Sequence, residues 1–183
     1  MPYSEPTFDN KIKNFLFAHP GKTYLDIGAG AGKYGKIIRK INPSAHLIGV
    51  EVNKEFITKF KLKDIYDEVY AGKIEDFVAQ KMVKEPRFTV DIAIIGDCLE
   101  HLKKSAGIDL LHYLVYRTKY IIVVFPSKWV QFDWQGHPFE AHQSVWEKRD
   151  FDTFSHQFQK IKHMNLIIIK GYLADPEALL TTD

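Results

Sequence analysis

The sequence predicts a doubly wound α/β domain, in which a mostly parallel sheet carries helices on both faces. Segments rich in β-branched and aromatic residues recur along the chain, separated by amphipathic segments of helical length. Two of the strand-like segments, DIAIIG and YIIVVF, are apolar without alternation, which is typical of strands that are covered on both faces. Alternating strands and helices with such buried strands are the pattern of a parallel sheet.

The expected elements follow one another as a βα repeat. Strands are expected over residues 23–27, 46–51, 68–71, 90–96 and 119–125. Helices are expected over residues 8–18, 32–41, 54–61, 74–82 and 99–116, and a further helix is expected to begin near Asp150. Residues 158–173 predict a tight hairpin that turns near residues 163–165, with its second strand at residues 166–173.

Length and composition indicate one globular domain spanning residues 1–183. Of these 183 residues, 45% are hydrophobic and 26% are charged, and the net charge of +2 includes no long run of one sign. This balance neither favours nor excludes nucleic acid as a partner. Cys98 is the only cysteine, so we expect no internal disulfide, and we expect a cytoplasmic, non-membrane protein because no signal or membrane-spanning segment is evident.

A glycine-rich turn joins the first expected strand to the following helix. In TYLDIGAGAGKYGKIIRK, residues Gly28, Gly30 and Gly32 stand where a side chain would block a ligand from approaching the backbone. The free N–H groups of the helix N-terminus would face an anionic or carboxylate group. Glu51 ends the second strand, where a carboxylate can accept hydrogen bonds from both hydroxyls of a ribose. Together, the turn and Glu51 predict a nucleotide-containing cofactor.

The identity of that cofactor depends on Asp26. The stretch from Gly30 to Gly35 matches the G-x-G-x-x-G pattern of dinucleotide-binding proteins, but it begins two residues later than the strand register requires. Asp26 lies just before the first glycine, where its charge would repel a pyrophosphate and would suit a ligand with a cationic end. S-adenosylmethionine carries both a sulfonium and an ammonium, so the charge at Asp26 favours it.

At three motifs the chain resembles the class I S-adenosylmethionine-dependent methyltransferases. These motifs are LDIGAGAGKYG, GVEVN and GDCLEHL, and the resemblance spans nearly the whole chain. It implies a seven-stranded-type sheet with helices on both faces and an antiparallel last strand, with S-adenosyl-L-methionine as cofactor. It also implies that Glu51 holds the ribose and Val52 contacts the adenine, that Glu75 and Asp76 reach the adenine amine, that Asp97 lies below the transferring methyl group, and that Asp26, Gly28, Gly30 and Gly32 surround the methionine part.

The end of the fourth strand is expected to face the acceptor. In open α/β sheets, ligands bind beyond the carboxyl ends of the strands, and Asp97, Cys98, Glu100 and His101 fall at such an end. Small-molecule methyltransferases of the resembled class have a similar D-x-x-E-H-L segment, which makes Asp97 and His101 candidate catalytic residues. Asp97 and Glu100 also fit a helix capping box, which is the structural alternative.

Residues 127–148 form a long expected loop rich in aromatic residues and histidines. It includes Trp134, His137, Glu140 and His142, of which the first three are predicted to contact the substrate. Methyl transfer requires one proton to be taken up, and His142 is the preferred candidate, with His137 as the alternative. GHPFEAHQSVW resembles the G-N-P-x-E-x-H-x-S-x-W segment of compact methyltransferases of glycans and other small molecules, although His137 replaces the asparagine usual there.

This loop has two other interpretations, and a hydrolase is a further alternative for the chain. In the first, the aromatic side chains merely pack together and form a structural cover. A metal site of His137, Glu140 and His142 is disfavoured because Pro138 prevents one regular helix, so no metal is expected. A serine hydrolase is excluded because there is no G-x-S-x-G elbow, and Cys98 has no thiol-protease context.

The predicted function is methyl transfer to an oxygen or nitrogen atom of a small molecule or glycan. The N/D-P-P-Y/F motif of many nucleic-acid amino-methyltransferases is absent from the fourth strand, and no basic stripe is concentrated on one segment. Nucleic acid is therefore an unfavoured partner. A methyltransferase acting on RNA or protein and a nicotinamide-dinucleotide-binding Rossmann protein remain as alternatives.

Overall fold

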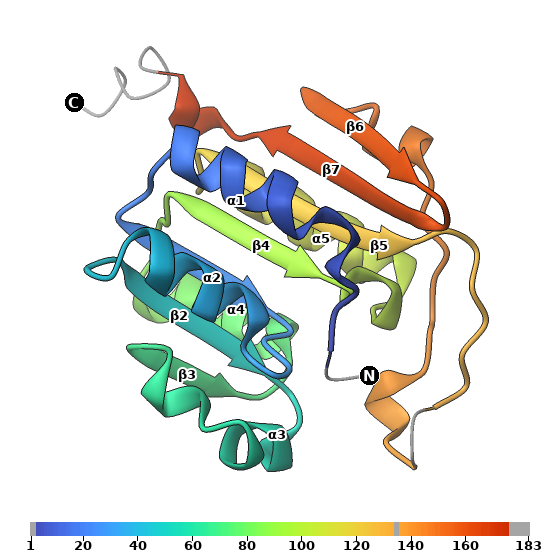
Figure 1. The fold of residues 1–183 in the computed structure, drawn as a ribbon, viewed down its shortest axis with the longest axis horizontal. Coiled ribbons are helices and arrows are strands. Elements are labelled where there is room, and N and C mark those ends of the chain that lie inside the picture. The colour runs from blue at the N-terminus through green and yellow to red at the C-terminus, as the bar shows by residue number, and fades with distance from the viewer. Residues whose placement is uncertain (1–2, 134–135, 176–183) are drawn as a thin grey trace.

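The computed structural model describes residues 3–133 and 136–175, and it contains one seven-stranded sheet (Figure 1). The strand order is β3-β2-β1-β4-β5-β7-β6. The first five strands are parallel, whereas β7 is antiparallel to β5 and β6 is antiparallel to β7. The strands are β1 (Thr23–Ile27), β2 (His46–Glu51), β3 (Glu68–Ala71), β4 (Ile92–Gly96), β5 (Tyr120–Pro126), β6 (His156–Ile161) and β7 (Met164–Lys170). The predicted fold class, including the antiparallel end of the sheet, is confirmed.

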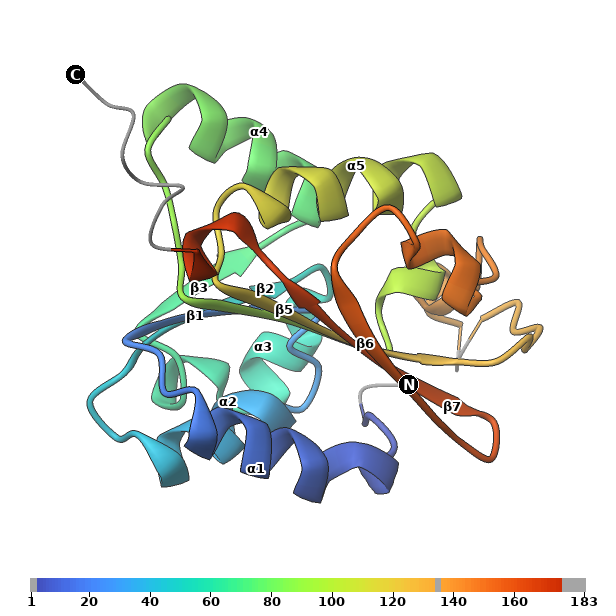
Figure 2. The same cartoon turned by 90° about the horizontal axis from the view of Figure 1, so that it is seen from above.

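Helices cover both faces of this sheet, as Figure 2 shows. On one face lie α1 (Asp9–Ala18), α2 (Lys33–Ile41) and α3 (Lys54–Lys59), and on the other lie α4 (Ile74–Lys84) and α5 (Lys104–Val115). Each face has its own apolar core, so the central strands are buried on both sides, as their unbroken apolar sequences predict. In the described ranges, 3–133 and 136–175, no helix has the length and apolarity needed to cross a membrane.

The expected helix over residues 99–116 is divided in two. A 3₁₀ turn at Leu99–His101 is separated from α5 because Leu102 is extended, with φ −90° and ψ 153°. Before the turn, Asp97 has a left-handed backbone, with φ 48°. The apolar periodicity does not reveal this interruption, which matters because it holds Glu100 and His101 at the end of the sheet instead of on the flank of a helix.

The C-terminal part also differs in detail from the expectation. The helix expected near Asp150 is a single 3₁₀ turn, Lys148–Phe151, which is held by a reciprocal capping box between Glu147 and Asp150. Phe151 from this turn is fully buried. The hairpin is confirmed, but its second strand begins at Met164 and ends at Lys170, a few residues before the predicted limits.

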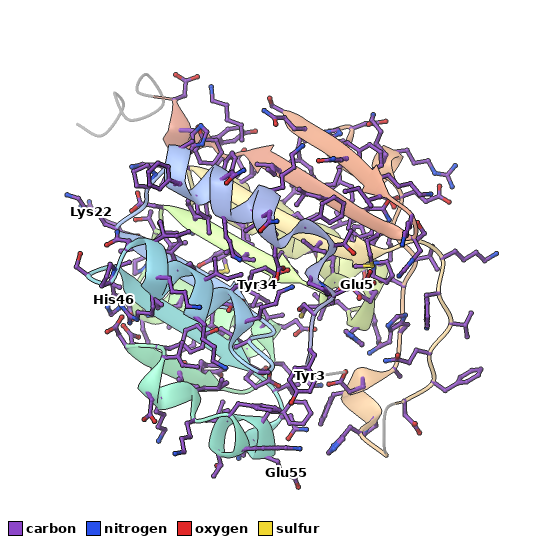
Figure 3. All side chains as sticks on the ribbon, in the orientation of Figure 1. Tyr3, Glu5, Lys22, Tyr34, His46 and Glu55 are labelled. Atoms are coloured by element: carbon purple, nitrogen blue, oxygen red, sulfur yellow. The ribbon has the colours of Figure 1, made fainter. Side chains whose placement is uncertain are left out.

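The carboxyl ends of the parallel strands meet the long loop after β5 at one end of the sheet (Figure 1). The N-terminal segment lies at the same end, where the ring of Tyr3 contacts Phe60 edge to face (Figure 3). Three segments distant in sequence thus enclose one region: the ends of β1, β2 and β4, the N-terminal segment, and the loop after β5.

Candidate functional site

A cavity of about 520 Å³ opens at the carboxyl ends of the strands. This volume lies within the range typical of sites for small molecules and cofactors. The residues that line it come from the glycine-rich turn, the ends of β2, β3 and β4, and the loop after β5: Ile27, Gly28, Gly30, Val50, Glu51, Val52, Phe56, Gly72, Lys73, Ile74, Glu75, Asp97, Cys98, His101, Leu102, Lys103, Pro138, Phe139, Glu140 and Gln143. The location is the one that the sheet topology predicts for a ligand.

The carboxylate of Glu51 is fixed in the wall of the cavity by two backbone donors. The N–H of Gly30 donates to Oε2 and the N–H of Asn53 donates to Oε1, each at 2.8 Å. Glu51 is only 5% exposed, and burial raises the pKa of its carboxyl group. Since each carboxylate oxygen has a second lone pair, both can still accept hydrogen bonds from a pair of ligand hydroxyls. The structure thus presents a preorganised acceptor for a diol.

The backbone of the glycine-rich turn borders the cavity directly, because glycine has no side chain. Gly28 and Gly30 both line the cavity and both have positive φ, 75° and 52°. The N–H groups of Gly28 and Ala29 donate to the carbonyl of Val50, which ties the turn to the end of β2. The left-handed backbone and the close approach explain why glycine occupies these positions.

Substitution of Gly28 by alanine should both strain and displace this turn. An added Cβ would lie 2.7 Å from Sγ and 2.8 Å from Cβ of Cys98, in addition to the cost of a positive φ. We expect Gly28→Ala to lower the free energy of unfolding by about 2–4 kcal/mol. Gly136→Ala is the matched control, because Gly136 has φ 78° and no atom within 4 Å of an added Cβ. Urea denaturation that shows equal losses for both variants would contradict the proposed overlap with Cys98.

Asp26 does not line the cavity, although the sequence predicts that it surrounds the methionine part of a cofactor. Its side chain lies in the core that contains Tyr66, whose hydroxyl donates to Oδ2 at 2.5 Å. Asp26 is 1% exposed, and burial raises its pKa to about 6. The reason is the strand alternation: the neighbouring Ile27 faces the cavity, so Asp26 points to the opposite face of the sheet. Gly32 is also outside the lining and packs against Ile65.

Asp97 lies in the lining, next to the N-terminal segment. The backbone N–H of Glu5 donates to Oδ2 of Asp97 at 3.2 Å, and Lys33 Nζ donates to the carbonyls of Ser4 and Glu5. Burial raises the pKa of Asp97 to about 6, and the charge of Lys33 opposes this shift. Figure 3 shows Glu5 beside this end of the sheet. The N-terminal segment therefore orients Asp97, a role that the sequence did not reveal.

The histidines of the site are not equivalent. His101 lines the cavity, whereas His142 lies outside the lining, with its ring centroid 4.8 Å from that of His101. His137 is also outside the lining; its Nδ1 lies 3.3 Å from Nδ2 of Asn53, and its ring contacts Phe56. The structure therefore favours His101, and not the expected His142 or His137, as the histidine that a ligand in the cavity meets.

Some of the other predicted contact residues line the cavity and others do not. Val52, Glu75 and Glu140 line the cavity, whereas Asp76 is exposed and does not. Trp134, predicted to contact the substrate, lies outside the described residues. Pro138 and Phe139, on the same loop as Glu140, also line the cavity, so the loop after β5 forms part of its wall.

Sequence reasoning missed two residues that support the site. Tyr66 supplies the partner of Asp26 from 40 positions away, and no local pattern indicates such a contact. Asn53 donates its backbone N–H to Glu51 and caps α3 with its side chain, which accepts from Glu55 N. An asparagine directly before a helical segment is a readable capping signal, so this second residue could have been found.

Comparisons with known proteins agree with the fold. No protein-family profile matches the chain, and no curated protein matches it by sequence. Among solved structures, an O-methyltransferase family protein from Burkholderia thailandensis superposes with a TM-score of 0.62 at 12% identity, covering 90% of this chain and 56% of that one. This chain thus spans little more than half of that protein.

This chain covers most of the length of two further solved structures. The N-terminal domain of EvdMO1, solved with SAH bound, superposes with a TM-score of 0.65 at 11% identity, covering 92% of this chain and 82% of that one. A SAM-dependent methyltransferase from Archaeoglobus fulgidus superposes with a TM-score of 0.64 at 17% identity, covering 91% and 97%. This chain has the Rossmann-like fold of the class I methyltransferases.

Proposed function

We propose that this protein is an S-adenosylmethionine-dependent methyltransferase that methylates an oxygen or nitrogen atom of a small molecule or glycan. The observation that carries the proposal is the Glu51 carboxylate, held by Gly30 and Asn53 at the cavity wall with both oxygens able to accept from a ribose diol. The fold of the chain and the SAH bound to the similar EvdMO1 domain support it.

The lining suits the separate parts of S-adenosylmethionine. Glu51 would hold the ribose, and Val52 and Phe56 would pack against the adenine, with Glu75 near its amine. Gly28 and Gly30 would let the methionine part pass close to the backbone, and Asp97 would lie near its cationic end. When bound, the cofactor supplies a methyl group on a positively charged sulfur. Asp26 would contribute indirectly, by fixing the strand that leads into the turn.

The loop after β5 would cover the acceptor and exclude water. Phe139 supplies an apolar surface to the lining, and Glu140 and Gln143 supply hydrogen-bonding groups. Such a mixed lining suits a sugar or another polar ring. A second structure of the EvdMO1 domain was solved in the presence of SAH and D-fucose, which supports a sugar-like acceptor here.

Methyl transfer to an O–H or N–H group forms one bond to carbon, breaks the sulfur–carbon bond, and releases one proton. His101 and Glu140 are titratable side chains in the lining of the cavity. Either of them would accept this proton. His142, the preferred base from the sequence, would act only through its contact with the His101 ring.

The test is a screen with S-adenosylmethionine labelled on its methyl group. Purified protein is incubated with panels of monosaccharides, small phenols, RNA and peptides, and the label transferred to each is counted. We expect transfer to a sugar or small ring compound, which Glu51→Gln should strongly reduce at a cofactor concentration that does not saturate the variant. Transfer to RNA or peptide alone would contradict the assigned acceptor class but keep the methyltransferase assignment.

A further inference from the structure

The geometry points to a divalent metal site formed by Glu100, His101 and His142 at the edge of the cavity. One ligand atom from each residue lies within 4.8 Å of the others. Two imidazoles and one carboxylate are a donor set typical of zinc and other first-row divalent ions. The site differs from the group of His137, Glu140 and His142 that the sequence suggested and disfavoured, because the 3₁₀ turn after β4 supplies two of the three ligands.

Each of the two histidines has one ring nitrogen beside a backbone carbonyl. Nδ1 of His101 lies 3.2 Å from the carbonyl oxygen of Ala141, and Nδ1 of His142 lies 3.0 Å from the carbonyl oxygen of Trp129. A carbonyl only accepts hydrogen bonds, so each Nδ1 carries the proton and each neutral ring keeps its Nε2 lone pair. A backbone carbonyl on the second ring nitrogen is the usual support of metal-binding histidines.

Glu100 provides an independent observation. The residue is 4% exposed, and within residues 3–133 and 136–175 its Oε2 atom has no hydrogen-bond partner. A buried carboxylate oxygen without a partner is unfavourable, because it loses its hydration without compensation. A cation bound between Glu100 and the two histidines removes this cost.

The backbone around the three residues is tied together. The carbonyl of Glu100 accepts from the N–H groups of Gln143 and Ser144, at 2.8 and 3.1 Å, which joins the turn after β4 to the loop that carries His142. Around a bound ion at about 2.1 Å, tetrahedral ligand atoms lie about 3.4 Å apart. Because the ligand atoms lie within 4.8 Å of one another, they would have to approach one another by up to about 1.4 Å to close around the ion.

The position of His101 implies a catalytic role for the bound ion, and this role rests on the proposed function. Because His101 lines the cavity, the ion would reach an acceptor hydroxyl and lower its pKa. The oxygen would then form the bond to the methyl carbon while the sulfur keeps the electron pair of the broken bond. The released proton would go to Glu140 or to water, since the coordinated His101 has no lone pair left for it.

The test is calorimetric titration of the chelator-treated protein with Zn²⁺ and, separately, Mn²⁺. We expect one ion per chain for at least one of the two metals, with affinity reduced at least about 100-fold in Glu100→Gln and in His142→Gln. His137→Gln is the matched control, because it removes a histidine of the same loop that belongs only to the alternative metal group, and it should bind as the wild type does.

Two results would overturn the metal site: no binding of either ion by the wild type, or equal affinity in wild type, Glu100→Gln and His142→Gln. A loss confined to His137→Gln would also overturn it. If Glu100→Gln does not fold, His142→Gln decides alone, because its side chain belongs to a surface loop. Titration of the same samples with SAH reports separately on the cofactor site, so the two proposals can fail independently.

Discussion

Replacement of Glu51 by glutamine is expected to weaken the binding of SAH at least about 100-fold. The two oxygens of Glu51 accept from Gly30 N and Asn53 N at the same time, so the amide NH₂ of glutamine would face one of these donors. The variant also loses the charge that strengthens hydrogen bonds to the ribose hydroxyls. Losing about 3 kcal/mol from these contacts corresponds to the stated change in dissociation constant, which calorimetry with SAH measures.

Glu55→Gln is the matched control for this experiment. Glu55 lies four positions later in the first turn of α3, is exposed, and points away from the sheet in Figure 3. Its variant should bind SAH as the wild type does. If Glu51→Gln also retained wild-type affinity, the ribose would not be held by Glu51, and the cofactor assignment would lose its main support.

Replacement of Asp26 by asparagine is expected to remove a large pH dependence of stability. Burial raises the pKa of Asp26 from 3.8 to about 6 in the folded protein. A carboxyl with a raised pKa contributes stability that is fully present below its unfolded pKa and is lost as the pH rises through its folded pKa. The shift corresponds to about 3 kcal/mol lost by the wild type between pH 3.5 and pH 7.

The measurement is urea denaturation of wild type and Asp26→Asn at several pH values across this window. The difference in unfolding free energy should change by about 3 kcal/mol in favour of the variant as the pH rises. Asp64→Asn, at an exposed carboxylate in the turn after α3, is the surface control for this comparison. A constant difference between wild type and Asp26→Asn would mean that burial does not perturb this carboxyl.

The sheet could be predicted closely because its physical signals are local. The strands 23–27, 46–51 and 68–71 have the predicted limits, since apolar β-branched segments with polar or glycine boundaries define them. The break after residue 101 was missed, because Leu102 continues the apolar pattern while its backbone leaves the helix. In the turn before this break, the carbonyl of Glu100 accepts from the N–H groups of Gln143 and Ser144, more than 40 positions away.

The sequence predicts which residues line the cavity where this depends on strand ends, and it predicts the lining less well where this depends on side-chain direction. Glu51, Gly28, Gly30, Val52 and Asp97 reach the cavity because each lies at or just after the carboxyl end of a parallel strand. Asp26 is one residue too early in its strand, and alternation turns it to the other face. The histidines could not be ranked, because the course of an irregular loop is set by long-range contacts.

The most direct test of the central claim is parallel calorimetric titration of the purified protein with S-adenosylmethionine, SAH and NADH. The structure predicts binding of the first two at micromolar concentrations, a scale usual for small ligands, and no binding of NADH. Binding of NADH without binding of S-adenosylmethionine or SAH would contradict the proposed methyltransferase function and would assign the cavity to a dinucleotide.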